Sequence, residues 1–417
     1  MHTRDFIRTL SATTIATLLG ERIWARYEPM PPSELASDEA FWTVLRSKYR
    51  LKPDYINLEH GFYSIQSTDV LDAFIANVRE VNYQGSYYMR TVQAADKLAA
   101  RVQLAAMAGC SPDELIITRN TTESLDTVIA GYDWKPGDEA VMAVQDYGAM
   151  LDQFALQAKR YGMVNRIVSL PNDPHSDAEL VQLYANAITP KTRLLLVSHL
   201  VNITGQILPV RKIADMAHAK GVAVAMDGAH AFAQLDYRIP DLGADYYAAS
   251  LHKWLGVPLG AGLLYVKQDR IAGLWPLFGD MGFGDTDIRK LNHTGTHPVH
   301  TDLAIRNAIA FHDSIGAPRK EARMRFLQQY WTTKVRGVKN VVINTPVDPM
   351  RSAGIANVGI AGMQPGVLAK TLLDRYRIWS VAIDRENVRG ARITPHLYTT
   401  TAELDTLVKA LTELAAA

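Results

Sequence analysis

Two polar side chains that follow apolar runs, Asp227 and Lys253, have the types and spacing to do chemistry together. Asp227 follows the run at 224–226, and Lys253 comes shortly after the run at 246–249. A carboxylate in an apolar setting needs a positive or hydrogen-bonding partner. A lysine amine among apolar and aromatic neighbours has a lowered pKa and is a candidate for Schiff-base formation. Taken singly, an aspartate at a strand end is more often a helix cap, and such a lysine is more often a surface residue.

A turn at residues 119–123 has the features of an anion site. Its residues, Arg-Asn-Thr-Thr-Glu, follow an apolar run and open a helical pattern, with Asn120 and Glu123 spaced as a variant of a capping box. Backbone N–H groups at a helix N-terminus bind phosphate. An ordinary capped helix has the same local pattern. Only the presence of Lys253 further along the chain therefore favours a phosphate site over a plain helix start.

Short apolar runs alternate with segments of helical period between residues 110 and 270. Gly162 and Gly221 follow two of the helical segments, as C-cap glycines do. This alternation predicts an α/β fold with a mostly parallel sheet, which binds ligands at the carboxyl ends of its strands. We expect strands at 114–118, 139–144, 165–170, 193–198, 222–226, 246–249 and 262–266, and helices at 124–132, 149–161, 177–187 and 210–220.

The C-terminal third predicts a long helical segment and then a small α+β domain. We expect helices at 301–315 and from 318 to about 335, apolar or periodic segments at 338–344, 354–360, 365–376 and 378–383, and a final helix at 402–416. The predicted division of the chain is a leader at 1–27, an N-terminal segment joining the small domain at 28–65, a large domain at 66–300, and a linking helix with the small domain at 301–417.

Composition excludes several classes of protein. The chain has 417 residues, 48% of them apolar and 21% charged, which is typical of a globular protein with two domains. A net charge of +1 provides too little positive potential to attract a nucleic-acid phosphate backbone, so we expect no nucleic-acid partner. Cys110 is the single cysteine, and no histidine pair has the spacing of a helix-borne zinc motif within an acidic constellation, so we expect no disulfide and no metal. No stretch approaches the roughly 20 apolar residues of an integral membrane span.

The N-terminus carries a leader-like pattern in which Arg4, Phe6 and Arg8 precede a weakly apolar run at 10–20. It resembles a degenerate twin-arginine export signal with Thr3 in place of the first arginine. An amphipathic leader that packs on a cytoplasmic enzyme accounts for the same residues equally well. The prediction is therefore a location in the cytoplasm or in the bacterial periplasm.

The order of Asp227, then Ser250-Leu251-His252-Lys253, resembles the class V branch of the fold type I pyridoxal-phosphate enzymes. This family includes aminotransferases, cysteine desulfurases and the isopenicillin N epimerase group, and the sequence around Tyr147 and Asn202 is similar to the last of these. The resemblance covers nearly all of the chain from about residue 55. It implies the fold type I architecture with a seven-stranded sheet between helices, and pyridoxal 5′-phosphate as cofactor.

The resemblance also implies the cofactor site. Lys253 would be the Schiff-base lysine, and Asp227 would pair with the pyridine nitrogen. The phosphate would lie near the turn at 119–123, and Thr296 would reach the phosphate of a neighbouring subunit, which makes the expected enzyme a homodimer with shared sites. The remaining positions matching cofactor-binding residues of the family are Thr121, Thr122, Ser250 and His252 at the phosphate, Tyr147 on the ring face, and Asn202 and His230 at the ring oxygen.

On the substrate side, Arg392 matches the arginine with which the family binds an α-carboxylate, and it precedes the capped start of the last helix. The loop at 61–63 resembles the segment over the site, which places Tyr63 near the substrate. Tyr87, Tyr88 and Arg90 are further candidates for this lining.

The resemblance narrows the reaction only in part. Aminotransferase-type chemistry on an amino acid or amine ranks first, and a racemase or epimerase or a β/γ-eliminating lyase stays open. A catalytically silent cofactor-binding scaffold is the alternative outside enzymes. A persulfide-forming cysteine desulfurase is disfavoured, because it needs a reactive cysteine after about residue 330 and the chain has only Cys110.

Overall fold

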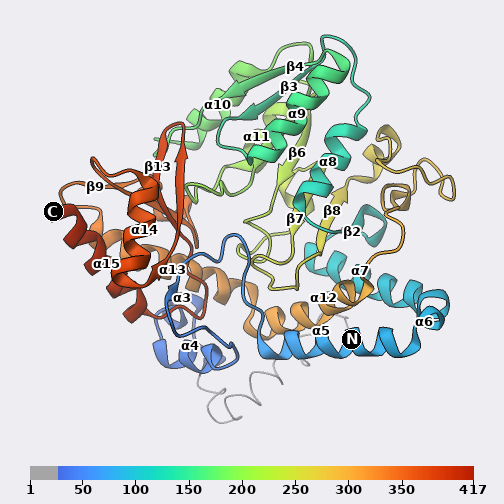
Figure 1. The fold of residues 1–417 in the computed structure, drawn as a ribbon. Coiled ribbons are helices and arrows are strands. Elements are labelled where there is room, and N and C mark those ends of the chain that lie inside the picture. Colours follow the sequence, from blue (N-terminus) through green and yellow to red (C-terminus); the bar gives the residue numbers. More distant parts are fainter. Residues whose placement is uncertain (1–26) are drawn as a thin grey trace.

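A seven-stranded sheet is the centre of the computed structural model, which describes residues 27–417 (Figure 1). The strand order is β2-β8-β7-β6-β5-β3-β4. All neighbours are parallel except that β8 runs antiparallel to both β2 and β7. The predicted mostly parallel sheet is confirmed. Its strands are β2 (Leu115–Thr118), β3 (Glu139–Ala143), β4 (Val164–Val168), β5 (Thr192–Ser198), β6 (Ala223–Asp227), β7 (Tyr246–Ser250) and β8 (Gly262–Val266).

The inner strands are apolar throughout because helices cover both faces of the sheet. Along β5, Leu194 and Leu196 pack in one buried cluster, and Leu195 and Val197 pack in the cluster on the opposite face. Successive side chains of a strand point to opposite faces, so a continuous apolar run feeds both clusters. The covering helices are α8 (Thr121–Gly131) and α9 (Gly148–Tyr161) on one face, and α10 (Asp177–Ala187) and α11 (Val210–His218) on the other.

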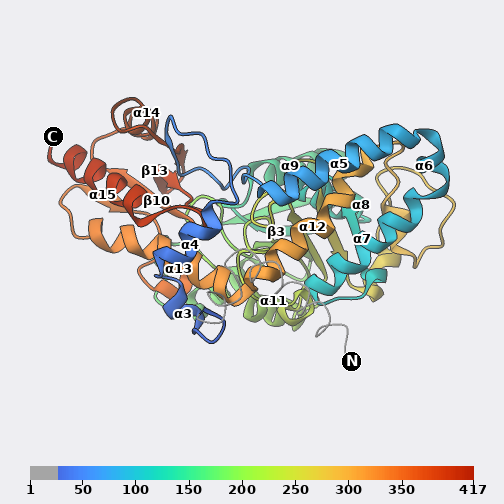
Figure 2. The same ribbon diagram turned by 90° about the horizontal axis from the view of Figure 1, so that it is seen from below.

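A layer of helices lies beneath the large sheet, where α12 packs between α5 and α7 (Figure 2). The helices at 68–108 were not predicted from the sequence. Only Val70 of α5 is buried in this chain, so no single apolar stripe stood out. This layer comprises α5 (Thr68–Gln84), α6 (Ser86–Thr91), α7 (Gln93–Ala108) and α12 (Val299–Ile315).

A smaller antiparallel sheet with the order β12-β13-β10-β9 forms a second body near the C-terminus. Its helices agree with the predicted segments, but the central strand β13 was not predicted. Arginines at 389 and 392 and a glycine between them weaken the strand pattern of β13, and its pairing with both β10 and β12 decides its conformation. The elements are α13 (Ala317–Val335), β9 (Val341–Ile343), β10 (Ala356–Ile360), α14 (Pro365–Tyr376), β12 (Val381–Arg385), β13 (Val388–Ile393) and α15 (Thr401–Ala416).

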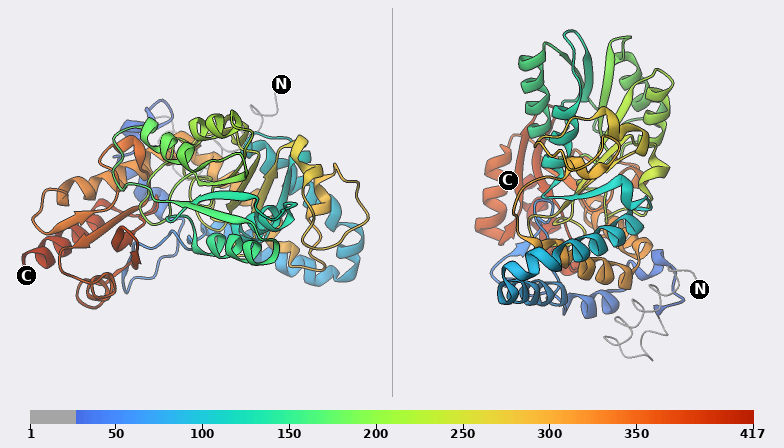
Figure 3. Two further views of the ribbon diagram at one scale, coloured as in Figure 1. Left: turned by 90° about the horizontal axis from the view of Figure 1, so that it is seen from above. Right: turned by 90° about the vertical axis from the view of Figure 1, so that its right-hand side faces the viewer.

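The N-terminal segment lies against this second body. β1 (Ile56–Asn57) pairs in parallel with β11 (Ile378–Trp379), and Leu58 belongs to the buried cluster of the small body. The short helices α3 (Pro32–Leu35) and α4 (Glu39–Arg46) lie beside α13 (Figures 2 and 3). The division into domains stays a proposal. The predicted leader lies, except for its last residue, outside the described residues.

None of the helices within residues 27–417 combines the length and the apolarity needed to cross a bilayer.

Candidate functional site

The candidate site lies at the carboxyl ends of β5, β6 and β7. Ser198, Asp227 and Ser250 are the last residues of these strands, and Ser198 pairs with Asp227 in the β5–β6 register. Because parallel strands end at the same edge of a sheet, polar residues from distant parts of the chain meet there. The structure thus brings Asp227 and Ser250 to the same edge, with Lys253 in the turn that follows β7.

Lys253 and His230 are in direct contact, with 3.0 Å between Lys253 Nζ and His230 Nε2. Burial lowers the pKa of Lys253 to about 8, and the carboxylate of Asp227 opposes that shift. Burial also holds the pKa of His230 well below its usual range, with a further contribution from the charge of Lys253. A neutral imidazole can accept a proton in a hydrogen bond, and an amine with a lowered pKa is nucleophilic near neutral pH.

Asp227 is a buried carboxylate that lacks a salt-bridge partner within residues 27–417. Its Oδ1 accepts a hydrogen bond from the backbone N–H of Ala229 at 2.9 Å. Burial raises the pKa of Asp227, and the nearby charge of Lys253 opposes this. Nδ1 of His230 and Nδ1 of His252 are buried without a hydrogen-bond partner among residues 27–417. Unsatisfied buried groups near the carboxyl ends of parallel strands are typical of a site that binds a polar ligand.

The N-terminus of α8 meets the end of β7 through Thr121 and Ser250. The backbone N–H of Thr121 donates to Ser250 Oγ at 2.9 Å, and the two hydroxyl oxygens are 2.7 Å apart. Asn120 caps the helix by accepting a hydrogen bond from the N–H of Glu123 at 2.9 Å. A side chain at position 262 would not fit, since a Cβ on Gly262 would lie 2.7 Å from Asn120 Cα.

The start of α8 therefore presents backbone N–H groups together with the hydroxyl groups of Thr121 and Ser250. Such donors at a helix N-terminus are suited to binding an anion. Thr122, the second residue of α8, is half-buried beside it.

Arg392 approaches the same region from β13 of the small body. Its Nη1 donates to the backbone oxygen of Asn202 at 3.2 Å, so these two predicted residues meet. Its Nε and Nη2 donate to the carboxylate of Glu59. The charge of Arg392 contributes to the lowered pKa of both Lys253 and His230. Glu59 was not predicted. Its only signal was its place just before the loop at 61–63.

The remaining predicted site residues lie at different distances from Lys253 and its neighbours. The ring of Tyr63 lies 6.4 Å from the ring of His252, and its hydroxyl donates to Gln66 Oε1 at 2.9 Å. Tyr147 is the N-cap residue of α9 and is 46% exposed, so it is not a core side chain. Thr296 lies exposed in the loop before α12, and the structure does not bring it to the site of its own chain.

A buried layer that was not predicted supports the turn carrying Lys253. The indole of Trp254 stacks on His396, with 5.8 Å between ring centroids and 3° between planes. Lys320 Nζ donates to the backbone oxygen of Trp254. Burial lowers the pKa of Lys320 to about 7. These contacts bring together residues from three distant parts of the chain, so no local sequence pattern could have shown them.

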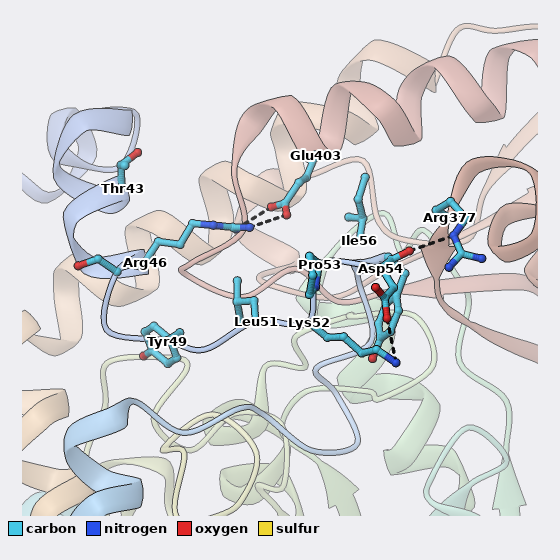
Figure 4. Close-up of a pocket in the computed structure, with 12 residues that line it drawn as sticks. Thr43, Arg46, Tyr49, Leu51, Lys52, Pro53, Asp54, Ile56, Arg377 and Glu403 are labelled. Atoms are coloured by element: carbon cyan, nitrogen blue, oxygen red, sulfur yellow. Dashed lines mark hydrogen bonds and ion pairs between the residues drawn. The ribbon is translucent and has the colours of Figure 1, made fainter.

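A pocket of about 640 Å³ lies elsewhere, between α4, the start of α15 and the segment at 51–56 (Figure 4). Arg46 and Glu403 form an ion pair of 2.8 Å at its wall, and Arg377 Nε donates to the backbone oxygen of Asp54. None of the predicted site residues lines it. Across residues 27–417, no group of three or more histidine, cysteine, aspartate or glutamate side chains is placed to hold a metal ion.

Comparison with known proteins matches residues 65–385 to the family model described as aminotransferase class-V. Isopenicillin N epimerase of Amycolatopsis lactamdurans is 30% identical over 89% of this chain and 98% of its own length. A "Probable cysteine desulfurase" of Halobacterium salinarum is 26% identical over 92% and 97% of the two chains. Among solved structures, a variant of the cystine C–S lyase C-DES, with glycine covalently linked to its PLP cofactor, has a TM-score of 0.78 at 23% identity, over 88% of this chain and 99% of its own.

Proposed function

The chain belongs to the class V aminotransferase family, and from this premise we propose that it is a pyridoxal-phosphate-dependent enzyme acting on an amino acid or amine. The observation that supports the proposal most is the position of Lys253. Its amine contacts His230 and lies within electrostatic reach of Asp227, at the carboxyl ends of parallel strands. The resemblance stated from sequence is confirmed at the level of the family.

The cofactor is pyridoxal 5′-phosphate, and the unsatisfied groups of the site fit it. Lys253 would hold it covalently, and the carboxylate of Asp227 would pair with its ring nitrogen. The hydroxyl groups and N–H groups at the start of α8 would bind its phosphate. When bound, the cofactor withdraws electrons from the substrate carbon that carries the amine. The other residues assigned to it are Thr121, Thr122, Ser250 and His252 at the phosphate, Tyr147 on the ring face, and Asn202 and His230 at the ring oxygen.

The chain's own groups would then handle the proton. Lys253 Nζ has a lowered pKa and would remove or return the proton at the substrate carbon. His230 Nε2 would hold the lysine amine in position. His230 is buried and Lys253 is half-buried, so little water screens the electrostatic effect of Asp227 on the site.

Aminotransferase-type chemistry is our first proposal for the reaction. Epimerisation is supported by the similarity to isopenicillin N epimerase, and elimination by a β/γ-lyase is the third choice. A persulfide-forming desulfurase stays disfavoured, although relatives bear that name. Cys110, the single cysteine, is half-buried against the core, and burial raises the pKa of its thiol to about 12. A thiol with so high a pKa provides little thiolate for attack.

We also propose a homodimer with shared sites. Large apolar side chains are exposed along α5, α6 and the loop at 275–281, and Thr296 is exposed further along the same connection to α12. Exposed large apolar side chains of this kind are typical of protein–protein interfaces, so we assign them to the contact between two subunits. The exposed residues are Leu71, Ile75, Val78, Tyr83, Tyr87, Trp275, Leu277, Phe278 and Met281.

Absorption spectroscopy tests the proposed function. Purified protein loaded with pyridoxal phosphate is expected to show a visible absorption band that borohydride bleaches. Lys253→Ala removes the band, whereas Lys290→Ala, a change at another buried lysine, leaves it. A protein that takes up no cofactor would contradict the proposal. It would also contradict the alternative of a catalytically silent scaffold, because that scaffold is expected to bind the cofactor.

The reaction is tested with a panel of amino acids and amines in deuterated water. A keto acid or aldehyde identifies transamination, deuterium at the α-carbon with inversion identifies epimerisation, and ammonia with an unsaturated product identifies elimination. A cofactor-loaded protein that gives none of these products would favour the silent scaffold.

A further inference from the structure

Arg392 already has a carboxylate partner within the chain. Its Nε donates to Glu59 Oε2 at 3.3 Å, and its Nη2 donates to Glu59 Oε1. The side chains of this pair are 9% and 7% exposed, respectively. The third nitrogen, Nη1, donates to the backbone oxygen of Asn202. The edge of the guanidinium formed by Nε and Nη2, which suits a carboxylate best, is therefore occupied.

The loop that carries Glu59 is fixed in place. The N–H of Phe62 donates to Glu59 Oε1 at 3.1 Å, so the carboxylate has a second anchor besides Arg392. The N–H groups of His60 and Gly61 donate to Thr394 Oγ1, at 2.7 and 3.0 Å, which ties the loop to the residue just past the end of β13.

Close packing also holds the loop against the guanidinium. A Cβ at Gly61 would lie 3.2 Å from Arg392 Cζ, so a larger residue here would have to push the guanidinium aside by a few tenths of an ångström. A substrate could displace Glu59 only by breaking its hydrogen bonds to Phe62 and to Arg392 together.

The electrostatic consequence concerns any second carboxylate. Glu59 offsets part of the charge of Arg392, and its own negative charge repels another carboxylate in a buried place where water screens little. Each terminal nitrogen of Arg392 keeps only one N–H free, since Nη1 and Nη2 each make one hydrogen bond. The pair can therefore offer hydrogen bonds to a neutral group more readily than a positive charge to an anion.

We infer that Glu59 is a specificity-determining residue that satisfies Arg392 from within the chain and selects against a free carboxylate on the substrate. The preferred substrate is then an amine whose reacting carbon carries no free carboxylate. This rests on the proposed function, because the substrate's amine is taken to react with the cofactor that Lys253 would hold. It revises the expected role of Arg392 from carboxylate binding to hydrogen bonding of a neutral group.

The first test measures binding of two unreactive probes, propionate and propionamide, to the cofactor-loaded enzyme by calorimetry. Glu59→Gln keeps the shape of the side chain and removes its charge. We expect it to raise the affinity for propionate about tenfold or more and to leave propionamide unchanged. The matched control is Glu139→Gln, since Glu139 binds Nε and Nη2 of Arg166 in the same way at the opposite edge of the sheet. It should change neither affinity. An unchanged affinity for propionate in Glu59→Gln would overturn the inference.

The second test needs no variant. Amino acids and their decarboxylated amines, matched in side chain, are compared by the change each causes in the visible absorption of the wild-type holoenzyme. We expect the amine of a pair to bind at least as tightly as the amino acid. Tighter binding of the amino acids by about tenfold or more would overturn the inference. If no compound of either kind changes the absorption, the proposed function fails, and the propionate measurement still decides the role of Glu59.

Discussion

Lys253 Nζ lies 3.0 Å from His230 Nε2, and both groups are charged less readily here than in water because they are buried. The lysine follows β7 and the histidine follows β6, so the contact exists only because these strands are neighbours. A neutral imidazole beside a partly neutral amine fixes the direction of the amine without adding charge to it.

His230→Phe removes the acceptor that orients the lysine. Turnover by the holoenzyme is expected to fall by about tenfold to a hundredfold, because an amine that is no longer oriented transfers a proton less efficiently. Steady-state kinetics over a pH series measures this, and the pH profile should move as well. His218→Phe, a change on α11 away from the site, is the control. Equal losses in both variants would show that only stability was affected.

Asp227→Asn keeps the shape of the side chain and removes its charge. We expect turnover to fall by about a hundredfold or more, because the neutral amide no longer holds a proton on the ring nitrogen. Single-turnover kinetics with saturating cofactor separates this from weaker cofactor binding. Asp245→Asn alters a buried aspartate at the other end of β7, paired with Arg270. It should lower the thermal stability while the holoenzyme spectrum stays the same.

Ser250→Ala removes a hydroxyl that joins β7 to the start of α8. The affinity for pyridoxal phosphate is expected to fall about tenfold, as for the loss of one hydrogen bond to a charged group. Equilibrium dialysis of the apoenzyme measures it. Thr127→Ala, further along α8, removes a hydroxyl that bonds only to the backbone oxygen of Glu123 and should leave the affinity unchanged. A Ser250→Ala protein with wild-type affinity would remove this residue from the phosphate site.

Lys320→Met removes the buried amine that supports the turn carrying Lys253, and it tests the lowered pKa of that amine. The pKa of Lys320 is lowered from 10.5 to about 7 by burial, so between these pH values the unfolded chain binds more protons than the folded chain. The free energy of unfolding should therefore rise with pH across this window, by up to about 1.4 kcal/mol per pH unit, and level off below it. Urea unfolding at several pH values measures this free energy, which should rise less steeply with pH in Lys320→Met than in the wild-type protein. An equal rise with pH in the two proteins would contradict the lowered pKa of Lys320.

Ile75→Glu places a charge within the exposed apolar surface of α5. If this surface is the dimer interface, the variant should sediment as a monomer and lose cofactor affinity, because the partner's Thr296 is no longer supplied. Ile167→Glu, an equally simple change at an exposed isoleucine on β4, serves as the control and should leave the sedimentation unchanged. A wild-type protein that sediments as a monomer would refute the shared site.

The sequence by itself determined the elements whose patterns are local. The seven apolar runs became the seven strands of the large sheet, and the segments at 177–187 and 365–376 became α10 and α14 with the predicted bounds. Burial on both sheet faces requires such runs in the inner strands, so each of these runs predicts its strand without knowledge of its neighbours, whereas β4 at the sheet edge has no fully buried residue. Asp227 followed by Ser250-Leu251-His252-Lys253, with the further motifs in the family's order, likewise led from the sequence to the family, which the comparison confirms.

Only the tertiary structure decided which distant groups meet. Glu59 and Arg392 are separated by 333 positions, and their contact depends on β1 pairing with β11 and on β13 pairing with its two neighbours. The same holds for Lys320 and Trp254, which are separated by 66 positions. Neither contact has a local pattern, because packing of whole elements, and not the periodicity of one of them, brings such side chains together. The pairing of Arg392 with the carboxylate of Glu59, and the substrate class inferred from it, could therefore be recognised only in the folded chain.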